Sequence, residues 1–379
     1  MKIKWLISAV LVAFLVLLLN SGSVAVSTRE VDDVLKKGVL DDGDLKIIDD
    51  FLAQAIKELV QTRDFTSIAK LRTVILSRQS NQGQYAQQFS ESARRHIAEG
   101  FQQAQELKRP ERITPVMINL LILMDGLQDL ALANQAVAML KNENMVIRYW
   151  AVHCLTNPEI ITKLNAATTS NQASIIAGQL QEIIETSTPE IIALIAQFAA
   201  GVNIPQAEQL LSQIADLRIK QYADWTVKYE LYDSAILKYL SSKIPLPSES
   251  PGLPLPTTTS TKPDLARRFA QLYSYVINRY AKGYAFMNDT QKSHLASVMV
   301  ETEDKCISRL LGSPQLTIRR ALERQNVQAV LAEHDRLLGS ATTPGQLPTA
   351  LKFDYGTNPT EPKRTVPLPL PDPPANPPK

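Results

Sequence analysis

Glycine is scarce in this chain, with 14 residues among 379, and the 23 prolines are distributed unevenly. Six prolines lie between Pro245 and Pro263, eleven lie from Pro344 onward, and the remaining six are spread over the rest of the chain. Proline interrupts helix interiors, so the proline-poor remainder is expected to be helical. Apolar residues make up 45% of the sequence, which supports a buried core, and the length favours two domains.

Residues that usually carry chemistry are also few. The histidines, His96, His153, His294 and His334, form no His-x-x-x-His pair, and adjacent His153 and Cys154 would point about 100° apart on a helix. The sequence has neither a Gly-x-Ser-x-Gly motif nor a glycine-rich phosphate loop. We therefore predict no catalytic, metal-binding or cofactor-binding residues.

The segment Asp42-Gly43-Asp44 invites comparison with a calcium loop, but its spacing fails. Counted from Asp42, an EF-hand loop needs glycine at the sixth position and glutamate at the twelfth, where Ile47 and Ala53 stand. Asp44 is instead expected to cap the amino terminus of a helix, where the helix dipole favours acidic groups.

Only two cysteines, Cys154 and Cys306, are present. In an exported protein they could form a disulfide, and closing a loop of this length could stabilise the fold by up to about 5 kcal/mol. The alternative, which we favour, is that they are two small buried apolar residues on separate helices.

The first 25 residues have the three parts of a secretory signal. Lys2 and Lys4 supply positive charge, residues 5–19 form an almost unbroken apolar run, and Ser23-Val24-Ala25 offers a cleavage site. As a helix, the run would span about 22 Å, less than the roughly 30 Å hydrocarbon core of a bilayer. We predict cleavage before Val26 and a periplasmic or secreted protein; an uncleaved signal that tethers the protein to the membrane is the alternative.

Charge is balanced once the signal is removed. Cleavage leaves 38 of the 40 basic residues beside 38 acidic ones. Such a balance offers no broad field to attract nucleic acid or an anionic membrane. We expect no nucleic-acid partner and no membrane insertion after cleavage.

Apolar residues recur at helical spacing through most of the chain, which predicts an all-α fold. One such run covers residues 47–60. Another has aromatic and aliphatic residues in steps of four, a stripe that is more often core than cofactor site: Tyr85, Phe89, Ala93, Ile97 and Phe101.

The segment 147–155, Ile-Arg-Tyr-Trp-Ala-Val-His-Cys-Leu, resembles the second helix of a HEAT repeat, and residues 131–140 resemble its first helix. Similar apolar segments begin at Ile147 and Ile191, 44 residues apart, within the roughly 40–47-residue period of such repeats. The match is specific over residues 131–156 and weaker up to residue 242. The resemblance implies an α-solenoid-like stack of helical hairpins, each burying its apolar face against its neighbours.

Two residues of this segment carry expectations of their own. The arginine of HEAT repeats is usually structural, so the resemblance implies that Arg148 bonds within or between hairpins. Trp150 shares a helix face with Val146 and Cys154, and we expect it in the core, where Trp150→Ala would cost on the order of 3–5 kcal/mol. The alternative is an exposed Trp150 that anchors a partner.

Composition divides the chain into five parts. After the signal peptide, residues 26–243 are predicted to form the repeat-like domain and residues 244–263 a Pro/Ser/Thr-rich linker. Residues 264–339 are predicted to form a second, C-terminal helical region. Residues 340–379 form a Pro-rich tail that favours polyproline II conformation and disorder.

The HEAT resemblance implies a non-enzymatic scaffold or adaptor, because proteins of this family mainly bind protein partners over extended surfaces. Fold analogy is a weak basis for function, so two alternatives stay open. One is a lyase-type member of the repeat superfamily that acts on a bound chromophore. The other is a structural envelope component with the Pro-rich tail as a spacer.

Overall fold

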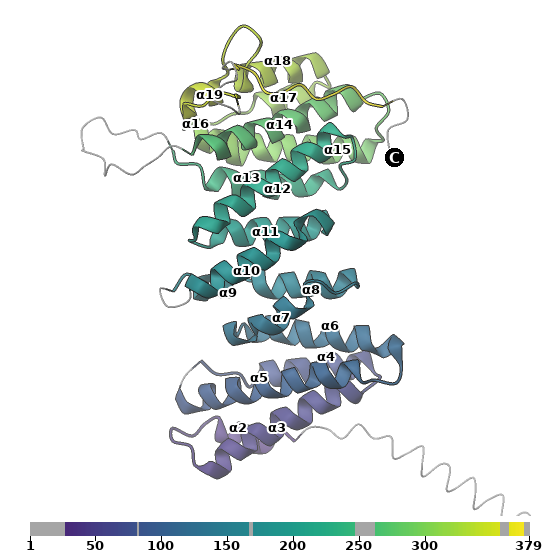
Figure 1. Ribbon diagram of the computed structural model, residues 1–379, viewed down its shortest axis with the longest axis vertical. Helices are drawn as coiled ribbons and strands as arrows, with labels where there is room; N and C mark the ends of the chain where they lie inside the picture. Colours follow the sequence, from purple (N-terminus) through teal and green to yellow (C-terminus); the bar gives the residue numbers. More distant parts are fainter. Residues whose placement is uncertain (1–26, 82, 167–169, 247–261, 357–363, 375–379) are drawn as a thin grey trace, which may run out of the picture. The chain divides into compact units, whose positions relative to one another are not determined.

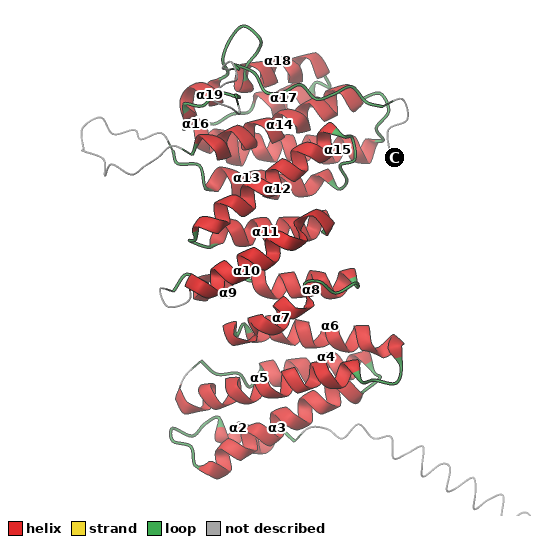
Figure 2. Cartoon of the chain, in the orientation of Figure 1, coloured by secondary structure: helices red, strands yellow, loops and turns green. Residues whose placement is uncertain are grey.

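The computed structural model describes residues 27–81, 83–166, 170–246, 262–356 and 364–374. This part of the chain is all-α and contains no strand (Figure 1 and Figure 2), as the periodicity predicts. The predicted signal peptide and most of the predicted linker lie outside the described residues. The chain divides into two compact units, Met1–Gln135 and Ala136–Lys379.

The first unit consists of helices that follow one another in the sequence and pack together. The apolar run at residues 47–60 lies on α3, which packs against α2, α4 and α5, and the predicted aromatic stripe on α5 is buried. The stripe is therefore core, as predicted. The elements are α2 (Arg29–Val34), α3 (Asp42–Gln61), α4 (Phe65–Leu76), α5 (Gly83–Gln105), α6 (Pro110–Leu127), η1 (Leu130–Leu132) and the start of α7 (Ala133–Met139).

The start of α3 corrects the prediction for Asp44. The N-cap is Asp41, whose carboxylate accepts a hydrogen bond from the backbone N–H of Asp44 at 2.9 Å. The Asp44 carboxylate accepts in return from the Asp41 N–H at 3.2 Å, which completes a capping box. Asp44 is buried, and its hydrogen bond from Lys37 Nζ at 2.6 Å lowers the pKa of its carboxyl group. The acid thus stabilises the helix start from the first turn instead of from the cap.

The second unit contains the rest of the helices, which also pack largely in sequence order (Figure 1). Its elements after α7 are α8 (Met145–Thr156), α9 (Pro158–Leu164), α10 (Ser170–Ile183), η3 (Ile184–Thr186), α11 (Pro189–Gly201), α12 (Pro205–Ala223), η4 (Glu230–Tyr232), α13 (Asp233–Ser242), α14 (Pro263–Gly283), α15 (Asp289–Thr302), the π-helical turn η5 (Glu303–Ile307), α16 (Ser308–Leu311), α17 (Thr317–Glu323), α18 (Val327–Leu338) and α19 (Gln346–Leu351).

Three helices of this unit begin at a constant interval. The first residues of α8, α11 and α13 are Met145, Pro189 and Asp233, so each helix begins 44 residues after the one before it. α11 packs against both α8 and α13. Local sequence explains two of these starts: the Asn144 side chain caps α8, and Pro189 occupies the first turn of α11, where its missing N–H is harmless.

The compact units do not follow the division predicted from composition. α14 comes after the predicted linker, yet it packs against α12 and α13, which precede the linker. Of the 21 residues of α14, 14 are buried. A helix buried on most of its sides needs partners in several directions, so the C-terminal helices belong to the same unit as α8–α13.

The chain beyond Ser340 also differs from the expected disorder wherever the structure describes it. It forms α19, and Tyr355 Oη donates a hydrogen bond to the carbonyl oxygen of Leu338 at 2.8 Å. Residues 364–374 form an extended segment that makes hydrogen bonds to α14 (Figure 1, yellow). The predicted proline-rich, extended character is present, but this stretch has a defined partner.

Candidate interaction site

The structure places Trp150 differently from the prediction. The buried stripe of α8 runs through Ile147, Ala151 and Leu155, and Trp150 lies one position to its side, half-buried. Val146, one turn before Trp150, is exposed. One position on a helix is a rotation of about 100°, which moves a large indole from the core to its edge. Trp150 therefore lies at the edge of the core and not inside it.

Aromatic rings gather around Trp150. Its ring centroid lies 5.7 Å from that of Tyr149, in an edge-on arrangement, and 5.1 Å from the imidazole of His153. Tyr149 and His153 are also half-buried. The middle of α8 thus presents an aromatic cluster at the surface instead of a single ring.

Arg148 makes its contact inside the same helix. Its Nη2 donates to Met145 Sδ at 3.1 Å, one turn earlier in α8, while its Nε is buried with no hydrogen-bond partner. This contact stays within one helix, so the bond within or between hairpins that the HEAT resemblance implies for Arg148 remains a prediction.

Further tyrosines extend this cluster from η4, which packs against α11. Tyr229 is 60% exposed and Tyr232 is 37% exposed. Burial raises the pKa of Tyr232, and the neighbouring Glu190, Tyr149 and Tyr229 raise it further. Both α8 and η4 pack against α11. We call Tyr149, Trp150, Tyr229 and Tyr232 the aromatic surface.

The loop that carries Tyr229 has an unusual backbone. Tyr229 has φ 53° and Trp225 has φ 57°, both in the left-handed region that bulky residues avoid. Each such residue costs on the order of 1–3 kcal/mol and persists only where the surroundings impose it. The strain is concentrated where one ring is turned outward, Tyr229, and another is turned inward, Trp225.

A buried ion pair holds the two ends of this loop. Arg218 on α12 donates from Nε and Nη2 to the two carboxylate oxygens of Asp233 on α13, at 2.7 and 2.8 Å. Tyr222 Oη donates to the same carboxylate at 2.6 Å, and all three side chains are buried. Arg218 Nη2 also reaches the carbonyl oxygen of Lys228 at 3.3 Å. The sequence does not reveal this pair, because a spacing of 15 residues matches no motif.

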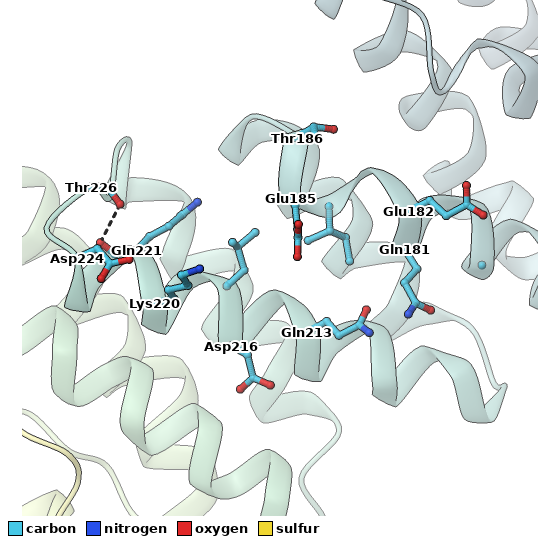
Figure 3. A pocket seen from close by; sticks show the side chains of 13 residues that line it. Gln181, Glu182, Glu185, Thr186, Gln213, Asp216, Lys220, Gln221, Asp224 and Thr226 are labelled. Carbon is cyan, nitrogen blue, oxygen red and sulfur yellow. Dashed lines mark hydrogen bonds between the residues drawn. The ribbon is translucent and has the colours of Figure 1, made fainter.

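A groove apart from the aromatic surface lies between α10 with η3 and α12 (Figure 3). It is an open polar groove of about 990 Å³ whose acidic lining includes Glu182, Glu185 and Asp216. Two of these carboxylates are paired with residues outside the groove: Glu182 with Lys141 at 2.6 Å and Asp216 with Arg268 at 2.8 Å. Neither Arg148 nor Trp150 lines it. Its acids therefore serve helix packing at least in part.

Residues weighed for chemistry lie apart from one another. Cys154 and Cys306 are both buried and are not joined by a disulfide, as we favoured from the sequence. His96 contacts Asp49 and Glu99 in the first unit, whereas His334 lies against Ser274 in the second. Within the described ranges, no group of three or more His, Cys, Asp or Glu side chains could hold a metal ion. No helix there is long and apolar enough to cross a membrane.

Comparison with known proteins adds no relative. No protein-family model, no curated protein and no solved structure matches the chain. The resemblance to HEAT repeats therefore depends on residues 131–156 and on the 44-residue interval between α8, α11 and α13, and the chain is described by its own architecture: an all-helical protein of sequentially packed helices.

Proposed function

We propose that the mature protein is an exported, non-enzymatic adaptor that binds another protein through its aromatic surface. The observation that carries this proposal is the exposure of aromatic rings on α8 and η4, including the tryptophan expected in the core. Tyrosine and tryptophan are enriched at the energetic centres of protein interfaces, because they bury large areas at a low cost in side-chain entropy.

The interval between helices supports a repeat-like basis for this surface. α8, α11 and α13 would be the second helices of successive HEAT-like hairpins, and residues at equivalent positions would line one edge. Trp150 on α8 corresponds to Leu194 on α11, and His153 corresponds to Gln197, all of them half-buried. Gln197 donates to the carbonyl oxygen of Thr156 at 3.4 Å and accepts from Tyr239 Oη at 3.4 Å, which links the three helices across this edge.

The residues that hold the aromatic surface in place favour binding. The Arg218–Asp233 pair fixes the loop that presents Tyr229, and the left-handed backbone at Tyr229 holds its ring outward. A surface held in place before binding loses less conformational freedom when a partner arrives. The backbone strain is then a cost in stability that the aromatic surface requires.

The test is affinity capture of a partner from the native envelope by the mature protein and two matched variants. The double variant Trp150→Ala/Tyr232→Ala should recover about thirtyfold less of a protein that the wild-type chain captures. This factor is equivalent to roughly 2 kcal/mol at an interface centre. The control is Phe65→Ala, which removes a 67% exposed ring from the first unit and should leave recovery unchanged. Equal recovery by all three proteins, with unchanged circular dichroism, would contradict the proposal.

Export has its own test. Sequencing the amino terminus of the protein from its native cell should give Val26 as the first residue. Recovery of the full-length, membrane-embedded chain as the main species would show that the signal is instead a membrane tether.

A further inference from the structure

The described end of the Pro-rich tail has a three-residue pattern of burial. Pro367 and Leu370 are buried, Arg364 and Pro373 are half-buried at the same interval, and the residues between them are mostly exposed. A polyproline II helix has three residues per turn, so every third side chain lies on one face. Residues 364–374 therefore present one face of a polyproline II-like segment to the protein.

The protein side binds the main chain of this segment. Gln271 forms two hydrogen bonds with Leu368: its Nε2 donates to the carbonyl oxygen at 3.0 Å, and its Oε1 accepts from the N–H at 2.8 Å. Lys282 Nζ donates to the carbonyl oxygen of Leu370 at 2.7 Å. A polyproline II helix has no internal hydrogen bonds, so its carbonyl oxygens are free for such donors.

Two aromatic side chains also donate hydrogen bonds to carbonyl oxygens of the tail. Tyr275 Oη donates to the carbonyl oxygen of Pro369 at 3.4 Å, and Trp225 Nε1 donates to that of Pro371 at 3.1 Å. Four consecutive carbonyl groups, from Leu368 to Pro371, thus have donors from one face of the second unit. One side-chain contact adds charge: Lys282 Nζ lies 2.6 Å from an Asp372 carboxylate oxygen.

We propose that this face of α14, with Trp225, is a recognition site for a polyproline II segment of a partner protein, and that the tail occupies it in the free chain. The site recognises main-chain carbonyl groups and two apolar positions three residues apart. It therefore selects a backbone conformation rather than one particular sequence. The expected partner segment carries Leu-Pro-Leu-Pro or a similar pattern, followed by an acidic residue opposite Lys282. This proposal is independent of the aromatic surface.

Residues 368–372 are held by side chains of α14 and by Trp225, so their release breaks no hydrogen bond within a helix. The start of the segment has separate anchors: the Tyr355 N–H donates to the carbonyl oxygen of Arg364 at 3.0 Å, and Thr365 Oγ1 donates to that of Ser340 at 3.2 Å. A tethered segment competes at an effective concentration on the order of millimolar. The tail of a second copy, at lower concentration, would offer only the same contacts and would not displace the tethered tail. A partner with further contacts elsewhere can displace it.

The experiment releases the tail in the full-length mature protein and adds a labelled peptide with the sequence of residues 364–374. Leu370→Arg places a charge at a position that is 1% exposed and should release the tail. We expect the variant to bind the peptide at least about tenfold more tightly than wild type, measured by fluorescence anisotropy, because the tethered competitor is gone. The matched control is Leu368→Arg, at a position 44% exposed in the same segment, which should behave as wild type.

Four further measurements test the site. Adding Gln271→Ala to Leu370→Arg should lose the peptide binding again, and a peptide with its prolines replaced by alanine should bind at least about tenfold more weakly. In a Trp150→Phe background, which leaves Trp225 as the single tryptophan of the mature sequence, the emission should shift to longer wavelength on tail release and return on peptide binding. Leu370→Ala, a milder change at the same position, should show the same ranking with smaller differences.

Either of two results would overturn the proposal. One is a folded Leu370→Arg or Leu370→Ala protein, with unchanged circular dichroism, that fails to bind the peptide although its Trp225 emission shows that the tail has left. The other is a wild-type dimer that Leu370→Arg abolishes, which would identify the tail of a second copy as the occupant.

Discussion

Two regions of the molecule use tryptophan in opposite ways: the aromatic surface, and the face of α14 and Trp225 that binds the tail, here called the tail site. Trp150 lies half-buried at the border of α8, among other half-exposed rings. Trp225 is 1% exposed, with the Arg279 guanidinium 4.4 Å from its ring centroid and its Nε1 bonded to Pro371. Arg279 is itself buried 3.8 Å from Glu230, so Trp225 stacks against a cation in the interior.

One loop serves both regions, since Trp225 and Tyr229 are its two left-handed residues. The difference between the regions is how much of each indole the chain covers: Trp225 is almost fully buried with its N–H hydrogen-bonded, whereas Trp150 has ring partners on its own helix but is only half-buried. A tryptophan becomes core when the fold supplies a hydrogen-bond acceptor and packing on its faces, and otherwise keeps one side for solvent or a partner. Four changes should break or sharpen this contrast.

The largest effect is expected from the ion pair that holds the shared loop. Asp233→Ala leaves the Arg218 guanidinium buried without its carboxylate and should lower the free energy of unfolding by about 3–5 kcal/mol. Urea unfolding of the mature protein measures it. Asp224→Ala, at an exposed carboxylate nearby in the sequence, is the control and should stay within about 0.5 kcal/mol of wild type.

A smaller effect is expected at the buried tryptophan. Trp225→Phe keeps an aromatic face toward Arg279 but removes the N–H that bonds to Pro371, so we expect a loss of about 1–2 kcal/mol. The equivalent change Trp150→Phe should cost less when both variants are unfolded under the same conditions. Equal losses of unfolding free energy in the two variants would mean that both indoles contribute equally to stability, against this contrast.

Trp150→Ala should cost about 1 kcal/mol rather than the 3–5 kcal/mol expected for a core tryptophan, because only part of its surface is removed from water. Leu155→Ala, on the buried stripe of the same helix, should cost about 2–5 kcal/mol and provides the reference. Thermal melting that ranks Trp150→Ala as the more destabilising of the two would return Trp150 to the core.

The smallest effect is expected from pH, at His334 of α18, which packs against α14. Burial lowers the pKa of His334, and its hydrogen bond with Asp335 only partly offsets this; Ser274 and Asn278 of α14 face the same ring. A histidine with a lowered folded pKa contributes stability above its unfolded pKa of about 6.5, and this contribution is lost as pH falls through that value. The melting temperature should therefore fall from pH 7.5 to 5.5, and His334→Gln should flatten that slope. A slope that His334→Gln leaves unchanged would assign the pH dependence to other groups.

The helices themselves follow from local sequence. The apolar run at residues 47–60 and the stripe from Tyr85 to Phe101 form α3 and α5 because each repeats at the helical period, which a sequence displays directly. The 44-residue interval from Ile147 to Ile191 likewise reappears as the interval between α8 and α11. The sequence predicts the capping acid of α3 three residues too late, because Asp41 and Asp44 both suit the cap and only geometry separates their roles.

Tertiary structure decided the sites. The sequence shows that Trp150 shares a face with Val146 and Cys154, but which part of that face is covered depends on where neighbouring helices lie. The sequence also determines that the tail is proline-rich and extended, since proline fixes its backbone torsion whatever surrounds it. Whether that tail stays in solvent depends on Gln271 and Trp225, about a hundred residues or more away, being brought to one face by the packing of α12 and α14. Torsional preference is local to a residue, whereas burial is a property of everything around it.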